Sequence, residues 1–179
     1  MAEQEIHLIE DRQEGDVNAR FGHEWRLVTD EVMGGVSNGQ LTTETIAQRP
    51  CLRMRGDVKL ENNGGFIQVA LSISAETRQV ISTYTGIMLE VYGNNEQYNL
   101  HLRTEDVHLP WQSYRTSFLA LTEWKTLYIP FTGFEPYRID TALDISRLKR
   151  IGLVAIGRKF KADLCIGKIG LYRRLNSTL

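Results

Sequence analysis

Several polar side chains that could bind a ligand alternate along one stretch near the middle of the sequence. If residues 97–103 are extended, Asn99, His101 and Arg103 lie on one side, because successive side chains of a strand point to opposite faces. Arginine supplies paired hydrogen-bond donors, and a nearby aromatic ring would supply a flat stacking surface. We therefore expect a ligand-binding face, whose candidate residues are Asn99, His101, Arg103, Trp111, Tyr114 and Arg115.

The segment that follows leaves two alternatives for the side chains that join this face. One alternative is Gln112 with Tyr114. The other is Trp111 with Ser113 and Arg115. Either set contains hydrogen-bonding groups and an aromatic ring, which suits a sugar or an anion.

The same face also has a plainer interpretation. It is then an ordinary solvated sheet surface, with its arginines paired to Glu90 or Glu96. Trp111 follows Pro110 near a turn and is the tryptophan most expected to be exposed, and a large exposed ring beside polar groups marks an interaction surface. A deep groove lined by arginine and an aromatic residue would favour a ligand, whereas a flat face would favour a protein partner.

Residues that could perform catalysis form no recognised arrangement. The four histidines are scattered without the spacing of a metal site, and the sequence has no G-x-S-x-G, P-loop or G-x-G-x-x-G motif. Adjacent acids such as Asp30 and Glu31 fall in predicted loops and are more typical of solvated turns. We therefore expect no enzymatic activity, no catalytic residue, no metal and no cofactor. A structural calcium ion at residues 61–64 is the alternative left open.

The sharpest local motif is residues 29–37, Thr-Asp-Glu-Val-Met-Gly-Gly-Val-Ser. Two consecutive glycines indicate a backbone that needs a positive φ or close packing. A carboxylate just before such a turn, here Asp30, can accept hydrogen bonds from backbone N–H groups. The motif is therefore predicted to be a rigid capped loop between two strands, and the alternative is a recognition loop.

The elements that must position these residues are strands. Alternating apolar residues predict about ten strands at roughly ten-residue intervals, the pattern of a sandwich or barrel. The predicted strands from the middle of the chain onward are residues 86–92, 98–103, 113–119, 124–130, 151–156, 162–166 and 168–172. Residues 86–92 and 98–103 are predicted to form a hairpin through the turn at 93–95, and 162–166 is predicted to pair with 168–172.

Length and composition limit the class of protein. The 179 residues are 42 % hydrophobic with a net charge of −1, which suits one domain with an ordinary core and lacks the basic field of a nucleic-acid binder. Cys51 and Cys165 are expected to be reduced and buried. No transmembrane segment, secretory signal or mitochondrial presequence is recognised, so we expect a cytoplasmic protein. We divide it into residues 1–20, an N-terminal arm or first strand, and residues 21–175, a single domain.

Further motifs follow one another in order along the chain. They are Trp25 with Asp30–Ser37, Asn63–Phe66, Tyr84–Ile87, Tyr98 with Arg103, Tyr114 with Phe118, Trp124 with Pro130–Phe131, and Leu143–Ser146. Together they resemble the signature of the complex I intermediate-associated protein 30 (CIA30) family over roughly residues 20 to 175. The resemblance implies an all-β, two-sheet jelly-roll sandwich, galactose-binding-domain-like and related in shape to carbohydrate-binding modules.

The resemblance also implies a function. Mitochondrial members act as assembly factors, or chaperones, for respiratory complex I (NADH:ubiquinone oxidoreductase), and they are not known as enzymes. We therefore expect a non-enzymatic domain that binds a protein partner. The residues expected to shape the partner surface are Asp30, Met33, Gly34, Gly35, Ser37, Gly64, Gly65 and Phe66. The second hypothesis is a carbohydrate- or small-ligand-binding module that uses the polar face, and the third is a structural domain without a small ligand.

Overall fold

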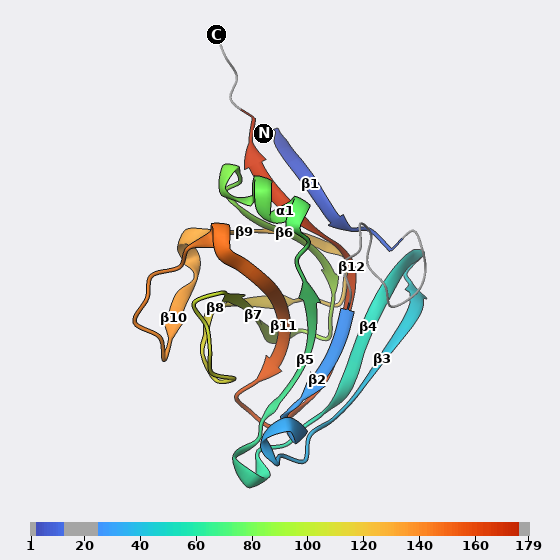
Figure 1. The fold of residues 1–179 in the computed structure, drawn as a ribbon. Coiled ribbons are helices and arrows are strands. Elements are labelled where there is room, and N and C mark those ends of the chain that lie inside the picture. The colour runs from blue at the N-terminus through green and yellow to red at the C-terminus, as the bar shows by residue number, and fades with distance from the viewer. Residues whose placement is uncertain (1–2, 13–24, 176–179) are drawn as a thin grey trace.

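The computed structural model describes residues 3–12 and 25–175 and shows an all-β jelly roll, a sandwich of two antiparallel sheets (Figure 1). Within these residues the first sheet has six strands. Its order is β3 (Asn38–Ile46), β4 (Arg49–Val58), β12 (Phe160–Arg174), β6 (Gly86–Tyr92) and β9 (Lys125–Pro130), and β1 (Gln4–Glu10) also pairs with β12. The predicted fold class is confirmed.

The second sheet carries the candidate site. In the described part of the chain its order is β10 (Glu135–Tyr137), β8 (Ser113–Ala120), β7 (Glu96–Thr104), β11 (Leu148–Ile156), β5 (Phe66–Ser72) and β2 (Trp25–Thr29). β11 thus lies between β7 and β5, although the three strands are far apart in the sequence. This topology brings four separate parts of the chain to one surface: β5, the segment from β7 to β8, β10 and β11.

Helical segments in the described part are short and lie in the connections between strands. They are α1 (Ala75–Val80) and the 3₁₀ turns η2 (Asp30–Met33), η3 (Glu61–Asn63), η4 (Ile81–Thr83), η5 (Phe131–Gly133) and η6 (Ile145–Arg147). Ser74 caps α1, since its side chain accepts a hydrogen bond from Thr77 N at 3.2 Å.

The hydrophobic core lies between the sheets and takes alternate side chains from each strand. In β7, Tyr98, Leu100 and Leu102 are at most 1 % exposed, and in β11 Ile151 and Leu153 are fully buried. The residues between them point to the outer face of the second sheet. The predicted alternation of residues 98–103 is therefore confirmed.

The predicted hairpin of residues 86–92 and 98–103 is wrong. Both segments are strands, but β6 pairs with β9 and β12 in the first sheet, whereas β7 pairs with β8 and β11 in the second. The turn between them crosses from one sheet to the other, and Gly93 N donates to Leu121 O at 2.7 Å. Alternation predicts the two faces of a strand but not its hydrogen-bonding partners.

The predicted pair of strands near the C-terminal end is also wrong. Residues 162–166 and 168–172 belong to one strand, β12, whose register shifts between Ile166 and Lys168. Such a bulge inserts one residue without ending the strand. A Cβ at the inserted Gly167 would lie 3.0 Å from the Trp124 ring, so the glycine serves close packing rather than a turn.

The N-terminal strand joins the body of the sandwich. β1 pairs with β12, and Glu10 accepts a hydrogen bond from Trp25 Nε1 at 3.1 Å. The predicted boundary between residues 20 and 21 lies outside the described residues, so that division stays a prediction. Cys51 and Cys165 are buried and free. None of the described helices has both the length and the apolar character needed to cross a bilayer.

Candidate functional site

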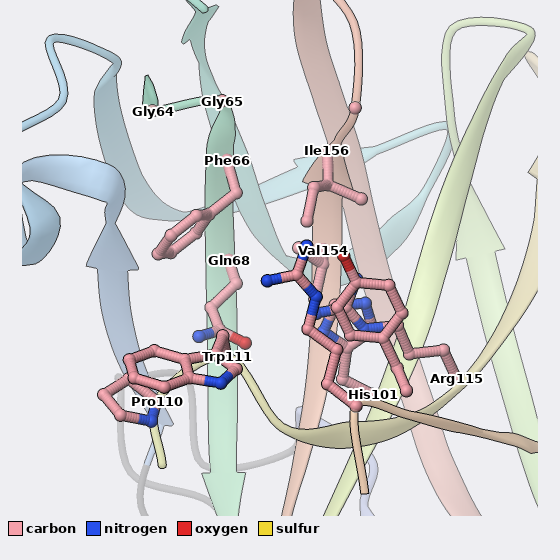
Figure 2. Close-up of a pocket in the computed structure, with 13 residues that line it drawn as sticks. Gly64, Gly65, Phe66, Gln68, His101, Pro110, Trp111, Arg115, Val154 and Ile156 are labelled. Carbon is pink, nitrogen blue, oxygen red and sulfur yellow. The ribbon is translucent and has the colours of Figure 1, made fainter. Parts of the chain in front are cut away.

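A pocket of about 510 Å³ opens on the outer face of the second sheet (Figure 2). This volume lies in the range of small-molecule sites, roughly 300–1,000 Å³. Its lining combines apolar and polar side chains, chiefly Phe66, Gln68, His101, Trp111, Arg115, Tyr137, Arg138, Val154 and Ile156. Figure 2 shows side chains of β5 and β11 side by side in the middle of the view, with His101 and Arg115 to their right.

The floor of the pocket consists of side chains that alternate with core residues. Gln68 of β5 lies opposite Val154 of β11, and His101 of β7 lies between Gly152 of β11 and Arg115 of β8. A Cβ at Gly152 would lie 2.5 Å from Gln68 Oε1. The glycine therefore leaves the space across the floor that the Gln68 side chain occupies.

One wall is formed by Arg115, Tyr137 and Arg138. The guanidinium of Arg115 stacks on the Tyr137 ring, with Cζ 3.6 Å from the ring centroid, and its Nε donates to Ser113 Oγ at 2.8 Å. Arg138 Cζ lies 5.3 Å from the centroid of the same ring. Stacking fixes the plane of a guanidinium and leaves donor groups at its edge available to a ligand.

The loop between β7 and β8 carries Trp111 and is held by Arg103. Arg103 Nη1 donates to three backbone carbonyl oxygens, those of Leu109 (3.2 Å), Pro110 (3.2 Å) and Gln112 (3.1 Å). Trp111 is 44 % exposed, as predicted. The guanidinium of Arg103 is thus engaged in positioning the loop.

Gln112 connects the same loop, through hydrogen bonds, to the wall that contains Arg138. Its Oε1 accepts hydrogen bonds from His108 N (3.2 Å) and Leu109 N (3.1 Å), and its Nε2 donates to Arg138 O (3.1 Å). Arg138 has a φ of 55°, a conformation that non-glycine residues rarely adopt. The amide of Gln112 therefore helps to hold Arg138 at the rim of the pocket.

His101 is a neutral polar group in the floor. Burial lowers its pKa to about 3, and the positive charges of Arg115 and Arg103 add to the shift. The ring lies 3.4 Å from the Asn99 amide, measured from Nε2 to Nδ2, and a neutral Nε2 can accept that hydrogen bond. At ordinary pH His101 therefore offers a hydrogen-bonding ring without a charge.

Four arginines gather around the pocket and the cleft beside it: Arg103, Arg115, Arg138 and Arg150. Across residues 3–12 and 25–175, none of them forms an ion pair with a carboxylate. Burial lowers the pKa of Arg103, with a further contribution from Arg150. Burial also lowers the pKa of Arg115, and Arg138 adds to that effect.

The alternative that these arginines pair with Glu90 or Glu96 is wrong. Glu90 lies in the first sheet and binds Arg49 and Lys168, and Glu96 binds Arg158. For Glu90, proximity in the sequence was a poor guide because β6 and β7 lie in different sheets, whereas Glu96 lies in β7 itself but pairs with Arg158.

The predicted ligand-binding residues are only partly brought together. Those that line the pocket or the adjoining cleft are His101, Arg103, Trp111 and Arg115. Asn99 contacts the His101 ring from the same strand. Tyr114 instead lies in the core, fully buried, and its hydroxyl donates to Thr141 O at 2.6 Å. Of the two alternatives for this segment, the set of Trp111, Ser113 and Arg115 lines the pocket or the cleft, and from the other set Gln112 lines the cleft while Tyr114 does not.

Three further residues of this pocket, Gln68, Tyr137 and Arg138, were not predicted from the sequence. Alternation along residues 66–72 could have placed Gln68 on an outer face, but nothing in it indicated that β5 adjoins β11. Tyr137 and Arg138 come from β10, which has only three residues and no alternating pattern, and the residue that follows it.

Asp30 is buried and binds two loops together. Its Oδ1 accepts from Ser37 N (3.0 Å), and its Oδ2 accepts from Ser37 Oγ (2.6 Å), Gly65 N (2.5 Å) and Phe66 N (3.3 Å). Burial by itself raises the pKa of Asp30, but these hydrogen bonds outweigh burial and hold the pKa below its ordinary value. The motif at residues 29–37 is thus a rigid capped loop.

The positions beside Asp30 require glycine for two different physical reasons. Gly34 has a φ of 83°, which a β-branched or bulky side chain would resist. A side chain at Gly35 or Gly64 would instead overlap the Asp30 carboxyl group. Both explanations that the sequence offered, positive φ and close packing, therefore apply.

Some of the predicted partner-binding residues belong to the buried hydrogen-bond cluster around Asp30, and others line the pocket. Asp30, Gly35 and Ser37 are buried, Met33 and Gly34 end the turn η2, and Gly64, Gly65 and Phe66 line the pocket. The two loops expose three apolar side chains, Val32 (71 %), Val36 (43 %) and Leu60 (48 %). Partner binding by this motif stays a prediction.

Comparison with known proteins supports one family and one fold. The family described as Complex I intermediate-associated protein 30 (CIA30) matches residues 16–166. No curated protein matches the chain.

Solved structures of carbohydrate-binding modules share the fold. The family 11 carbohydrate-binding module of the cellulosomal cellulase Lic26A-Cel5E of Clostridium thermocellum superposes with a TM-score of 0.73 at 14 % identity, covering 93 % of this chain and 94 % of that one. A family 11 module from the same organism, in complex with a β-1,3-1,4-mixed-linked tetrasaccharide, gives a TM-score of 0.69 at 14 % identity and covers 96 % of both chains. A family 30 carbohydrate-binding module gives 0.56 at 14 % identity, covering 78 % of this chain and 77 % of that one.

Proposed function

Since this chain belongs to the complex I intermediate-associated protein 30 (CIA30) family, we propose that it acts by binding rather than by catalysis, and that a saccharide is bound in the pocket on the second sheet. The sequence favoured a protein partner and ranked a carbohydrate second. The pocket supports the opposite order, because a flat face would have suited a protein and this face is hollowed.

The observation that carries the proposal is the composition of this pocket. An exposed indole, Trp111, lines the pocket together with Gln68 and His101 (Figure 2). A flat ring can stack on the apolar face of a sugar ring, while amide and imidazole groups bind its hydroxyls. The bound tetrasaccharide of the family 11 module, a protein of the same fold, is consistent with this use of the architecture.

A binding measurement on the full chain tests the proposal. A glycan array first selects plant and bacterial oligosaccharides that bind, and isothermal titration calorimetry then measures their affinities. Trp111→Ala should weaken binding by roughly tenfold, because a stacking surface is removed. Tyr128→Ala is the matched control, since Tyr128 is 45 % exposed on the other sheet. Absence of binding across the array, or equal losses in the two variants, would refute the proposal.

A second candidate function is assistance in complex I assembly, which the family match favours. Val32 and Leu60, exposed on loops that Asp30 ties together, are apolar side chains suited to a protein partner. Crosslinking in the native cell should then recover complex I subunits with the wild type and fewer with Val32→Asp. Unchanged recovery with Val32→Asp, or equal loss with Tyr128→Asp, would contradict this use of the loops.

A further inference from the structure

We propose that the saccharide bound in this pocket carries an anionic group, a carboxylate or a sulfate, that lies against Arg115 and Arg138. The inference rests on the proposed function, because it specifies the chemistry of the same ligand. Uronic acids and sulfated sugars are the two sources of such a group, and both present charged oxygen atoms to the protein.

The charge of the lining is the first argument. The pocket and the adjoining cleft contain four arginines and no aspartate or glutamate. Glu135 is the register partner of Arg115 on β10, yet among the ion pairs of the described residues none joins these two side chains. Uncompensated cations in a partly buried site are costly unless a ligand supplies the opposite charge.

The balance of donors and acceptors is the second argument. The Arg115, Arg138 and Trp111 side chains can only donate hydrogen bonds. Acceptors in the same lining are few, chiefly the Gln68 amide oxygen, the neutral His101 ring and the Tyr137 hydroxyl, which can also donate. Hydroxyl groups of a neutral sugar need acceptors as well as donors, whereas a carboxylate or sulfate only accepts. The lining therefore suits a ligand rich in acceptors.

The presentation of the two arginines is the third argument. Arg115 is fixed by its stack on Tyr137 and by its hydrogen bond to Ser113, so its guanidinium is oriented before a ligand arrives. Arg138 is held through its backbone by Gln112 in a left-handed conformation. Backbone strain of this kind persists where the surrounding structure enforces it, and it is concentrated at binding sites.

The positive charge is local to this surface. The whole chain has a net charge of −1, so general attraction of polyanions does not explain binding at this face. Short oligosaccharides are therefore the appropriate probes, since they bind one site and give a defined stoichiometry.

The experiment compares ligands that differ only in charge. Calorimetry on the full chain uses oligogalacturonate against the same oligosaccharide after reduction of its carboxyl groups, and sulfated against unsulfated dextran oligosaccharides. We expect one charged member to bind roughly tenfold or more tightly than its neutral counterpart, because a hydrogen bond to a charged group is stronger than one to a neutral group. The preferred pair identifies the anion as carboxylate or sulfate.

Three variants assign the effect to the named residues. Arg115→Gln and Arg138→Gln should each remove most of the preference, and Arg138→Glu should reverse it. Arg174→Gln is the control for net charge, because Arg174 is exposed on β12 in the other sheet. Circular dichroism confirms folding, and the exposed position of Arg138 keeps the test valid if Arg115→Gln is unstable.

The outcomes separate the two proposals. Equal binding of charged and neutral members would overturn the anionic ligand and leave saccharide binding intact. Absence of binding by every saccharide, charged or neutral, would overturn the proposed function itself. A preference that survives both Arg115→Gln and Arg138→Gln would place the anion elsewhere and also refute the inference.

Discussion

Asp30 shows how one buried carboxylate can organise two loops. Its two oxygen atoms accept four hydrogen bonds, three of them from backbone N–H groups and one from a hydroxyl. Ser37 Oγ also bonds Lys59 at its N–H (2.8 Å) and C=O (3.1 Å). Because Gly65 and Phe66 also line the pocket, the hydrogen bonds of Asp30 hold one edge of the candidate site in place.

Asp30→Asn should destabilise the fold by about 3 kcal/mol, because the new NH₂ group would face donors and leave buried groups unsatisfied. Urea denaturation measures the change. Glu31→Gln is the control, since Glu31 is exposed and adjacent. A midpoint equal to that of the wild type would contradict the role assigned to Asp30.

The stabilisation by Asp30 should also depend on pH. The pKa of Asp30 is lower in the folded than in the unfolded chain, so its contribution is complete above the unfolded value of roughly 4 and is lost as the pH falls through the folded pKa. The stability of Asp30→Asn should accordingly vary less with pH below about pH 4.

His101 gives a second, separate pH window. The pKa of His101 is about 3 in the fold, chiefly because of burial and then because of Arg115 and Arg103. In the unfolded chain a histidine titrates near pH 6.5. Between these values the unfolded state binds more protons, so the contribution of His101 to stability is complete above about pH 6.5 and is lost as the pH falls toward 3.

His101→Gln should remove this pH dependence while keeping a polar side chain in the floor. The wild type should lose on the order of 3 kcal/mol more than the variant between pH 6.5 and pH 3. Urea midpoints measured across that range check the difference, and NMR titration of the imidazole reports its charge directly. A histidine signal that titrates near pH 6 and disappears in the variant would show that the assigned pKa is wrong.

At the scale of elements, the site depends on two short segments that strand patterns do not mark. The loop between β7 and β8 carries Trp111, and β10 carries Tyr137 beside Arg138. Gln112 joins them with hydrogen bonds to Leu109 and Arg138. The two walls of the pocket are therefore coupled through one amide side chain.

Gln112→Ala should loosen this connection without unfolding the sandwich. Three hydrogen bonds at a partly exposed position are lost, so we expect about 1 kcal/mol of destabilisation and a several-fold loss of saccharide affinity. Acrylamide quenching of tryptophan fluorescence should rise, because Trp111 is the most exposed tryptophan among those described. Gln79→Ala on α1 is the control. Unchanged quenching and unchanged affinity would contradict the role of Gln112 in positioning the walls of the pocket.

At the scale of the whole molecule, the outer faces of the two sheets differ in whether their arginines form ion pairs. On the first sheet Arg53 pairs with Asp163 (2.7 Å) and Glu44 (3.2 Å), and Arg55 also pairs with Glu44 (3.3 Å). On the second sheet the arginines around the pocket lack such partners within the described chain. The contrast indicates that the uncompensated charge belongs to one face and is not a general property of the surface.

The sequence by itself determined the strands and their faces. Apolar side chains at every second position place Tyr98, Leu100 and Leu102 in the core and leave His101 and Arg103 on the other side. That outcome depends only on local geometry, since a strand repeats every two residues. The ordered motifs likewise indicated the family and its two-sheet fold.

Only the tertiary structure decided which strands meet and hence which residues share a site. Sequence spacing placed residues 86–92 and 98–103 in one hairpin, yet they lie in different sheets, because hydrogen-bonding partners are chosen by packing across the whole core. The phase of β8 buries Tyr114 and presents Arg115, and pairing of β10 with β8 brings Tyr137 onto that guanidinium. These are contacts between distant segments, which local patterns do not encode.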